Sequence, residues 1–312
     1  KKREEQKIIN TLEGDPLKNR QEILRRLSTV ADTLIMTCTA YFSNQLTTIH
    51  GLPSFLSSYK QNQPTSLAIL CSGDLGAEEL NYNSPIDLSF VYSNRGETFG
   101  RDKKSIDNNE FYTTLFQKVA KTLSAKNPER AIMSYDHFID HHMNHANDLE
   151  RVALVSTRVL ADDSEFRTRL EQQIEQLAYD RPLPLGFAKE MTLNHESELT
   201  NVTKVLRFIQ LSHGTIFKDL RKRSLFDVLN ILKGHALFKQ NELELMIAAH
   251  ALDGTIASLL YLITGKAGGI LDVESDTCTE IARRLRLRDK NEFKEKLLET
   301  RKVVYNILIS HV

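Results

Sequence analysis

A chain of 312 residues can bury a full hydrophobic core and is long enough for about two domains. Its 41 Lys and Arg residues balance 41 Asp and Glu residues, so the formal charge is zero, which argues against binding to nucleic acid or a membrane through overall charge. We find no apolar run of the roughly 20 residues that cross a bilayer, and no signal peptide. The chain begins at Lys1 rather than at Met, which suits a fragment or a trimmed form of a longer protein.

The three cysteines, Cys38, Cys71 and Cys278, share no metal-binding spacing. An odd number of cysteines without such spacing is typical of a reducing compartment, because secreted proteins tend to pair their cysteines. We therefore expect a cytoplasmic protein.

The N-terminal part of the chain predicts helices that support a sheet. Residues 1–13 are charged and helical in tendency. Asp15 and Pro16 form a helix start signal, and apolar residues then recur at helical spacing as far as Ile49. We expect this long helix to brace the sheet domain. Gly51 ends the helix, and the polar residues 57–66 link it to the first strand.

Residues 67–92 have the layout of a phosphate and metal site. An apolar strand at residues 67–71 leads into a turn at Ser72 and Gly73, and a second apolar strand, residues 86–92, opens on Asp87. Small residues at such a turn let backbone N–H groups approach a phosphate, and a carboxylate on a strand can hold a metal ion that bridges phosphate oxygens. This order of features is typical of a nucleotidyltransferase.

The rest of the chain is expected to be mainly helical. A polar loop at residues 93–107 precedes a helix at residues 108–123 and a mostly helical segment at residues 130–159. Pro182 and Pro184 mark the clearest linker. Further helices are expected at residues 191–213, 220–233, 241–264, 276–285 and 290–310.

These elements predict an α+β fold in three parts. Residues 1–63 form an N-terminal helical brace, residues 64–180 form a nucleotidyltransferase-like mixed sheet with flanking helices, and residues 181–312 form a C-terminal all-helical domain.

Residues 72–92 also resemble one family in detail, the glutamine synthetase adenylyltransferase/adenylyl-removing enzyme, and most closely its N-terminal adenylyl-removing half. Weaker similarity at residues 96–111, 149–162 and 210–225 extends the resemblance over nearly the whole chain. The positions that match the family's signature in register are Gly73, Leu75, Gly76, Ala77, Glu79, Leu80, Asn81, Ser84, Ile86, Asp87, Leu88, Phe90 and Tyr92.

The resemblance implies a nucleotidyltransferase that transfers adenylyl groups or removes them by phosphorolysis. It also implies a protein partner, glutamine synthetase or a regulatory protein. From the layout and the resemblance together, Ser72, Gly73 and Ser84 are candidate nucleotide-binding residues, and Asp87 is the candidate catalytic and metal-binding residue.

The departures from the family pattern fall on the charged positions of this site. Asp74 stands where the family has Lys, and Glu78 stands where it has Arg, so two cations are replaced by anions beside a loop that is expected to meet phosphate. Pro85 stands at the first acid of the family's Asp-x-Asp pair and has no ligand atom. Only Asp87 remains of that pair.

Two further acidic features of the family are also missing. Its third acid lies on a later strand, but residues 130–134 already fit the segment downstream of that strand, so we interpret the strand and its basic loop as deleted. The acids of a later motif fall on Asn201 and Thr203. Two-metal phosphoryl chemistry needs several carboxylates to fix the ions, so one Asp is not enough.

The function we favour is therefore a degenerate member of the family, catalytically impaired and serving as a binding or regulatory module, with no cofactor expected. The alternative is an active metal-dependent nucleotidyltransferase or adenylyl-removing enzyme that uses Mg and ATP or ADP. In that case its missing carboxylates would come from Asp74, Glu78, Glu79 or Asp136.

Two other groups of residues are candidates for a binding site, one rich in histidine and one rich in basic residues. His137, His141 and His145 recur every four residues on an expected helix and form an alternative metal site, against which stands the simpler interpretation of a solvated polar face. Basic clusters at residues 221–223 and 283–288 have acidic neighbours and no interleaved aromatic residues, so we expect solvated surfaces and no nucleic-acid site.

Overall fold

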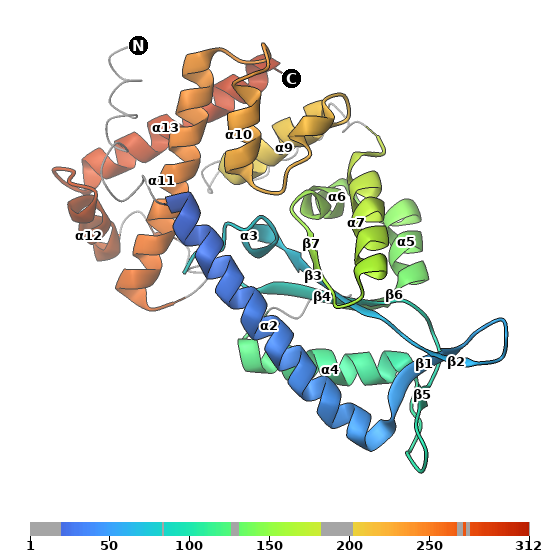
Figure 1. The fold of residues 1–312 in the computed structure, drawn as a ribbon. Helices are drawn as coiled ribbons and strands as arrows, with labels where there is room; N and C mark the ends of the chain where they lie inside the picture. The colour runs from blue at the N-terminus through green and yellow to red at the C-terminus, as the bar shows by residue number, and fades with distance from the viewer. Residues whose placement is uncertain are drawn as a thin grey trace. The chain divides into compact units, whose positions relative to one another are not determined.

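The computed structural model describes residues 20–82, 84–125, 131–181, 202–266, 271–272 and 275–311. It confirms the α+β class, with two small sheets, flanking helices and a helical C-terminal region (Figure 1). The expected helix at residues 1–13 and the linker at Pro182 and Pro184 lie outside the described residues.

The described chain divides into two compact units. The sheet unit contains Arg26–Glu78 and Pro85–Ala178, and the helical unit contains residues 20–25, Glu79–Ser84 and the described residues from Tyr179 onward. This division separates residues 79–84 from the strands on either side of them, which the three expected sequence domains did not.

The larger sheet of the sheet unit carries the stretch that the sequence singled out. Its strand order is β6-β4-β3-β7, with β3 at Leu67–Ser72, β4 at Asp87–Tyr92, β6 at Ile132–Ser134 and β7 at Arg158–Leu160. β3 is antiparallel to both β4 and β7, whereas β4 is parallel to β6, so the sheet is mixed as expected. The two predicted strands of this stretch are confirmed.

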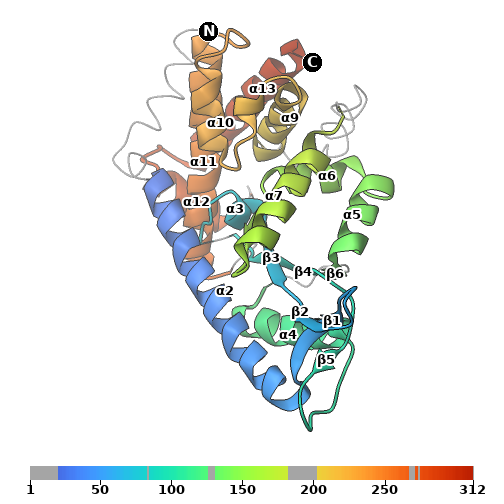
Figure 2. The ribbon, with the colours of Figure 1, turned by 45° about the vertical axis from the view of Figure 1, so that its right-hand side comes forward.

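Helices cover both faces of this sheet. In both ribbon views α4, Asn108–Leu123, lies on one face, and α5, α6 and α7, Tyr135–Asn144, Asp148–Val155 and Ser164–Tyr179, lie on the other (Figures 1 and 2). On the α4 side, Phe116 meets the ring of Phe90 on β4 edge to face, with ring centroids 5.1 Å apart. The side chain of Asp107 caps the N-terminus of α4 by accepting from the Asn109 N–H, so this helix begins where the sequence predicted.

Residues 131–159 are mostly helical, as expected, but two short strands that the sequence did not predict flank the helices. The described part of this segment begins with strand β6, continues through α5 and α6, and ends in strand β7. Ser134 and Asn147 cap the two short helices with their side chains, so each helix begins directly after its capping residue. β6 and β7 have three residues each, too few to show a strand period in the sequence.

Residues 52–64 and 98–99 form a second, three-stranded sheet that the sequence did not predict. Its order is β2-β1-β5, with β1 at Leu52–Leu56, β2 at Asn62–Pro64 and β5 at Thr98–Phe99, all antiparallel. The expected polar link, residues 57–66, therefore contains the loop and the second strand of a hairpin. β2 is exposed along its whole length and therefore carries no buried apolar face that would mark it as a strand in the sequence.

The long N-terminal helix is confirmed as α2, Arg20–His50, and it ends at Gly51 as predicted, whereas its predicted start signal at Asp15 and Pro16 lies outside the described residues. Within the sheet unit it buries Ala31, Ile35 and Leu46. Gly51 has φ +87°, and a Cβ there would lie 2.5 Å from the Phe99 carbonyl oxygen, so only glycine fits this close approach of β5.

The helical unit consists of packed helices, close to those predicted. They are α9, Val202–Gly214; α10, Leu225–Leu232; α11, Gln240–Thr264; α12, Asp276–Arg284; and α13, Lys290–His311, with a short 3₁₀ turn at Lys218–Leu220. α11 lies at the centre, in contact with each of the other four. Gly265 ends it in a left-handed conformation, as expected for a helix stop.

α11 also corrects our reading of the apolar runs. Among the described helices it is the one whose length and composition would allow it to cross a membrane. Leu243, Met246, Ala249 and Leu252 on this helix are buried among its helical neighbours, and a core helix passes the same test.

Candidate functional site

The turn after β3 brings three of the candidate site residues together. Ser72 pairs with Asp87 in the register of β3 and β4, so the last residue of one strand faces the first residue of the next. Gly73 follows with φ +62° and starts α3, Gly73–Gly76. A Cβ at Gly73 would lie 3.5 Å from Asp87 Oδ2, so the carboxylate rests beside the turn. The arrangement predicted for a phosphate and metal site is present as backbone geometry.

Gly76 allows the turn to pack tightly against the sheet unit. A Cβ at this position would overlap both the Ser156 carbonyl oxygen and the Cys71 carbonyl oxygen. Neither backbone atom can move without displacing a strand or a helix end. The glycine is therefore required by packing, and it sets the path of the chain on the way to Glu78.

The Ser72 hydroxyl is held by the residue that precedes β7. Ser72 Oγ lies 3.1 Å from Thr157 Oγ1, and Thr157 Oγ1 donates its proton to the Ala153 carbonyl at 3.0 Å. Because a threonine hydroxyl has one proton, Ser72 is the donor to Thr157. This bond orients the side chain of a residue that we predicted to contact nucleotide.

Arg158 ties three elements of the sheet unit to the turn. Its guanidinium donates to Asp32 Oδ2 at 2.7 Å and to Asp32 Oδ1 at 2.8 Å, and to the Leu75 carbonyl at 3.1 Å. It therefore joins β7, α2 and α3. Burial by itself would lower the pKa of Arg158, but the hydrogen bonds and charge of Asp32 raise it overall. Such a bidentate pair positions the turn rather than performing chemistry.

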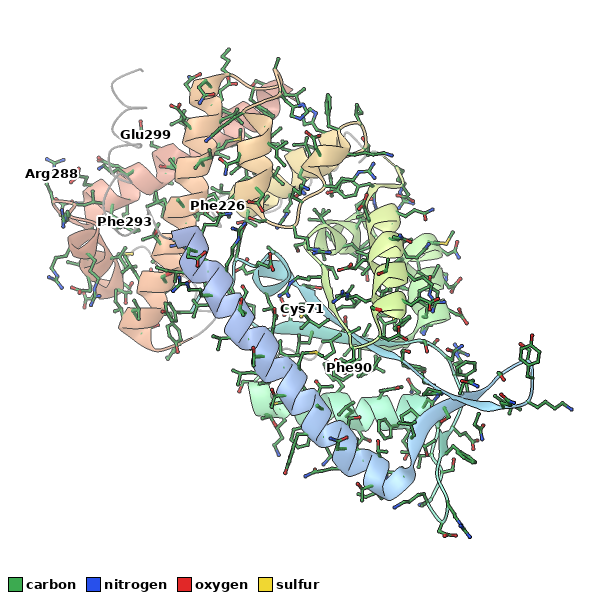
Figure 3. All side chains as sticks on the ribbon, viewed as in Figure 1. Cys71, Phe90, Phe226, Arg288, Phe293 and Glu299 are labelled. Atoms are coloured by element: carbon green, nitrogen blue, oxygen red, sulfur yellow. The ribbon has the colours of Figure 1, made fainter. Side chains whose placement is uncertain are left out.

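Cys71 does not have the properties of a nucleophile. It is fully buried on β3 in the four-stranded sheet, next to the strand that carries Phe90 (Figure 3). Burial raises the pKa of its thiol to about 12, so the thiolate is scarcely formed at neutral pH. It is a residue of the core.

The acidic residues at the site do not form a metal centre. In the described part of the chain, no group of three or more His, Cys, Asp or Glu residues is arranged to hold a metal ion. Pro85, which offers no ligand atom, stands two residues before Asp87. The residues present therefore do not fit the magnesium that a two-metal mechanism requires.

β6 modifies the expectation that a whole strand is missing. A strand does follow α4 and lies parallel to β4, with Phe90 paired to Ile132 and Tyr92 to Ser134. Its residues are Ile132, Met133 and Ser134, and none of them is a carboxylate. The sheet thus has a strand on this side of Asp87 without an acid among its residues.

Asp74 and Glu78, the two anions in place of family cations, are both exposed. Glu78 has φ +59°, a left-handed conformation that is uncommon for a residue with a side chain. The turn therefore offers negative charge to solvent at the positions where a phosphate site needs positive charge.

Glu79 is engaged inside the helical unit, which the sequence did not reveal. Its Oε1 accepts from Ser224 Oγ and from the Leu225 N–H, both at 2.7 Å, and its Oε2 lies 3.0 Å from His250 Nε2. Burial alone would raise its pKa, but the hydrogen bond and charge of His250 and the charge of Arg207 lower the pKa of Glu79 to about 2. This carboxylate stabilises the N-terminus of α10 and is already occupied, so it does not serve as a replacement metal ligand.

The residues after Glu79 also contact helices of the helical unit. Asn81 donates to the Gly254 carbonyl at 2.8 Å and accepts from Ser258 Oγ at 2.6 Å, both on α11. Ser84, a predicted nucleotide-binding residue, accepts from the Asn81 N–H at 3.1 Å and closes the turn of this segment. Ser84 therefore belongs to the helical unit, unlike Ser72, Gly73 and Asp87.

An aromatic pair forms a further contact between these residues and α11. Tyr82 stacks on Tyr261 of α11 with ring centroids 6.2 Å apart. Residues 79–82 are thus packed within the helical unit by both polar and aromatic contacts.

The three histidines on α5 do not gather into a metal site. His141 is buried, and its Nε2 lies 3.1 Å from Glu150 Oε1, which links α5 to α6. His145 is the C-cap residue of α5 and donates its backbone N–H to the His141 carbonyl, while its Nε2 lies 3.8 Å from Asp140 Oδ2; His137 lies in the first turn of the helix. No metal-binding group of three exists among the described residues, so we do not propose these histidines as ligands.

The fold and the turn define a class of protein, an α+β chain with a nucleotidyltransferase-like mixed sheet and a helical domain. Comparison with known proteins then shows the family: residues 3–173, more than half of the chain, match the family described as glutamate-ammonia ligase adenylyltransferase. The chain belongs to this family.

Individual relatives of the chain carry the name of the same family, and their sequence identity to it is low. The chain is 25% identical over 296 residues to the bifunctional glutamine synthetase adenylyltransferase/adenylyl-removing enzyme of Mannheimia haemolytica, covering 83% of this chain and 30% of the relative. It is 27% identical over 250 residues to the protein of the same name from Pseudomonas aeruginosa, covering 68% of this chain and 25% of that protein. The chain therefore spans less than a third of the length of these relatives.

Proposed function

We propose that this chain is a catalytically impaired member of the family that serves as a binding or regulatory module for a protein partner. The observation that carries the proposal is the sequence at the start of β4: the strand opens on Asp87, and Pro85, two residues earlier, stands where the family's Asp-x-Asp pair has its first acid. A single carboxylate neutralises too little charge to hold two metal ions on a transferring phosphoryl group.

The charge beside the turn supports the same conclusion. Asp74 and Glu78 are exposed, and each would repel a nucleotide phosphate where the family has a cation that attracts it. The packing around the turn, in contrast, is retained. Gly76 fits close contacts that leave no room for a side chain, and Arg158 donates a hydrogen bond to α3. Retained packing with altered site charge is what we expect of a fold kept for binding.

The partner we propose is glutamine synthetase or one of its regulatory proteins, because the relatives are named for acting on glutamine synthetase. We place the protein in the cytoplasm, and the unpaired state of Cys38, Cys71 and Cys278 supports this compartment.

Transfer of labelled AMP from ATP to purified glutamine synthetase, with magnesium, tests the loss of catalysis. We expect no transfer above background by the wild type or by Asp87→Asn, and no rise in melting temperature of the wild type with ATP and magnesium. Robust transfer that Asp87→Asn abolishes would instead establish the alternative, an active enzyme that takes its other ligands from Asp74, Glu78 or Asp136.

A restored variant serves as the positive control. Pro85→Asp together with Asp74→Lys and Glu78→Arg rebuilds the family's charges at three exposed or half-buried positions, so it is expected to raise the affinity for ATP and magnesium above that of the wild type. Direct binding of the wild type to immobilised glutamine synthetase tests the partner separately, because binding does not depend on turnover. A chain that fails to bind glutamine synthetase would rule out that partner while leaving the impaired site intact.

A further inference from the structure

A small apolar pocket lies in the helical unit, between α11, the turn after α12 and α13. Its lining residues are Leu252, Leu285, Leu287, Phe293, Lys296, Leu297 and Thr300. The two polar members are already engaged, because Thr300 Oγ1 donates to the Lys296 carbonyl at 2.7 Å and Lys296 Nζ pairs with Glu292 Oε1 at 3.7 Å. Since the remaining lining is apolar, the pocket suits an aliphatic side chain better than a polar ligand.

The turn after α12 builds one side of this pocket. Arg286 has φ +58°, and the Leu287 N–H donates to the Ala282 carbonyl at 2.9 Å, which is the Schellman pattern of a helix end. Leu285 and Leu287, on either side of this arginine, both line the pocket. The left-handed position of the pattern is normally a glycine, so an arginine there is strained. Arg286 is exposed and places a positive charge at the edge of the pocket.

The chain enters the described structure next to this pocket. Arg20 belongs to the helical unit, and its Nη1 donates to Thr255 Oγ1 on α11 at 3.0 Å. A Cβ at Gly254 would overlap Arg20 Nη2, so the arginine rests directly on α11. Thr255 is three residues from Leu252 of the pocket, about 4.5 Å along the helix. Residues 1–19, which lie outside the described residues, are therefore tethered beside the pocket.

The N-terminal segment, residues 1–19, has the apolar side chains that such a pocket requires. Ile8, Ile9 and Leu12 form one apolar stripe in an otherwise charged and polar stretch of helical tendency. Leu12 stands eight residues before Arg20, which is about 12 Å in a helix and about 27 Å in an extended chain. The stripe is therefore long enough in reach to cover the pocket from its tether.

Charge and tethering both favour this segment over a free partner. Glu13 directly follows Leu12, whereas Arg286 stands exposed between the two leucines of the turn, so opposite charges meet when Leu12 enters the pocket. A segment on a short tether also has an effective concentration of about millimolar, far above that of a typical free protein.

We propose that the N-terminal segment covers this pocket within its own chain, with its apolar stripe packed against the pocket leucines. A partner that binds at the pocket must then displace the segment. In the full chain with Cys38→Ser, the pair Leu12→Cys and Leu287→Cys tests the contact. Cys71 and Cys278 are fully buried and do not compete. We expect mild oxidation to form an intramolecular disulfide between the two new cysteines, identified by mass spectrometry.

The matched control is Asn10→Cys with Leu287→Cys, because Asn10 would lie about 160° around a helix from Leu12. This pair should form its disulfide at least about tenfold more slowly, since tethering alone brings it together only by chance. Equal rates in the two pairs, or no disulfide in either, would overturn the proposal. A disulfide found only between two copies would overturn docking within one chain.

Melting temperatures test the same contact without new cysteines. Leu12→Ala and Leu287→Ala should each lower the melting temperature, and the double variant should melt close to the less stable single variant, because both substitutions remove one contact. Leu298→Ala is the control, because it removes an exposed leucine of α13 outside the pocket, so its effect should add to that of Leu12→Ala. Additive losses for Leu12→Ala and Leu287→Ala would overturn the proposal.

Discussion

Glu79 and His250 are 171 residues apart in the chain, yet the imidazole Nε2 lies 3.0 Å from the carboxylate in the interior of the helical unit. A carboxylate can only accept, so His250 donates from Nε2. The same carboxylate accepts from the first backbone N–H of α10. The side chain of Glu79 thereby fixes its own segment to α10 and α11 within the helical unit.

Glu79→Gln should lower the free energy of unfolding of the helical unit by about 2 kcal/mol, because the amide nitrogen cannot accept from His250 or Ser224 and leaves a buried donor unsatisfied. Glu244→Gln makes the same chemical change at an exposed position of α11 and should alter stability by less than about 0.5 kcal/mol. Urea unfolding followed by circular dichroism measures both. Equal effects of the two substitutions would show that the buried hydrogen bonds of Glu79 do not contribute to the free energy of unfolding.

The contribution of Glu79 should depend on pH. Its pKa is about 2 in the folded protein against an ordinary value of 4.5, so the unfolded chain takes up its proton first as pH falls. The stabilisation is therefore complete above pH 4.5, decreases between pH 4.5 and about 2, and amounts to about 3 kcal/mol at most. The difference in unfolding free energy between wild type and Glu79→Gln should shrink over this interval. A difference that stays constant down to about pH 3 would contradict the assignment.

Asp32→Asn should destabilise the sheet unit by about 2 kcal/mol, because it leaves the buried Arg158 guanidinium without its counter-ion. The exposed pair of Arg25 and Asp227 provides the control, and Asp227→Asn should cost less than about 1 kcal/mol. The double variant Asp32→Leu with Arg158→Met should recover much of the loss, because it leaves no unpaired charge. Thermal melts of the wild type and these variants distinguish the outcomes; additive losses in the double variant would contradict the pairing.

Gly76→Ala should disrupt the turn, since the added Cβ would overlap the Ser156 and Cys71 carbonyl oxygens. We expect a loss of about 3 kcal/mol or more, or failure to fold. Gly234→Ala adds the same methyl group where the nearest atom is 3.4 Å away, and should be tolerated. Soluble yield and melting temperature report both changes. A fully stable Gly76→Ala protein would mean that the turn can take another path.

Local signals in the sequence predicted the elements that carry a long regular pattern. The helical period located α4, α11 and the end of α2 to within a few residues, and two apolar runs located β3 and β4, because such elements bury a face that repeats along the chain. β2, β6 and β7 escaped prediction. They have three residues each and are held by pairing with a neighbouring strand, which no local pattern records.

The sequence by itself also determined which charged residues stand in the site motif. Asp87 has no second acid beside it, and Asp74 and Glu78 stand where the family has cations. Only the tertiary structure decided what the neighbouring residues do. Glu79 and Ser84 stand in the same motif as Asp87, but they attach to the helical unit, because the partners of Glu79 are 145 to 171 residues further along the chain. Such contacts depend on how distant helices pack, and packing brings together residues whose separation in the sequence carries no signal.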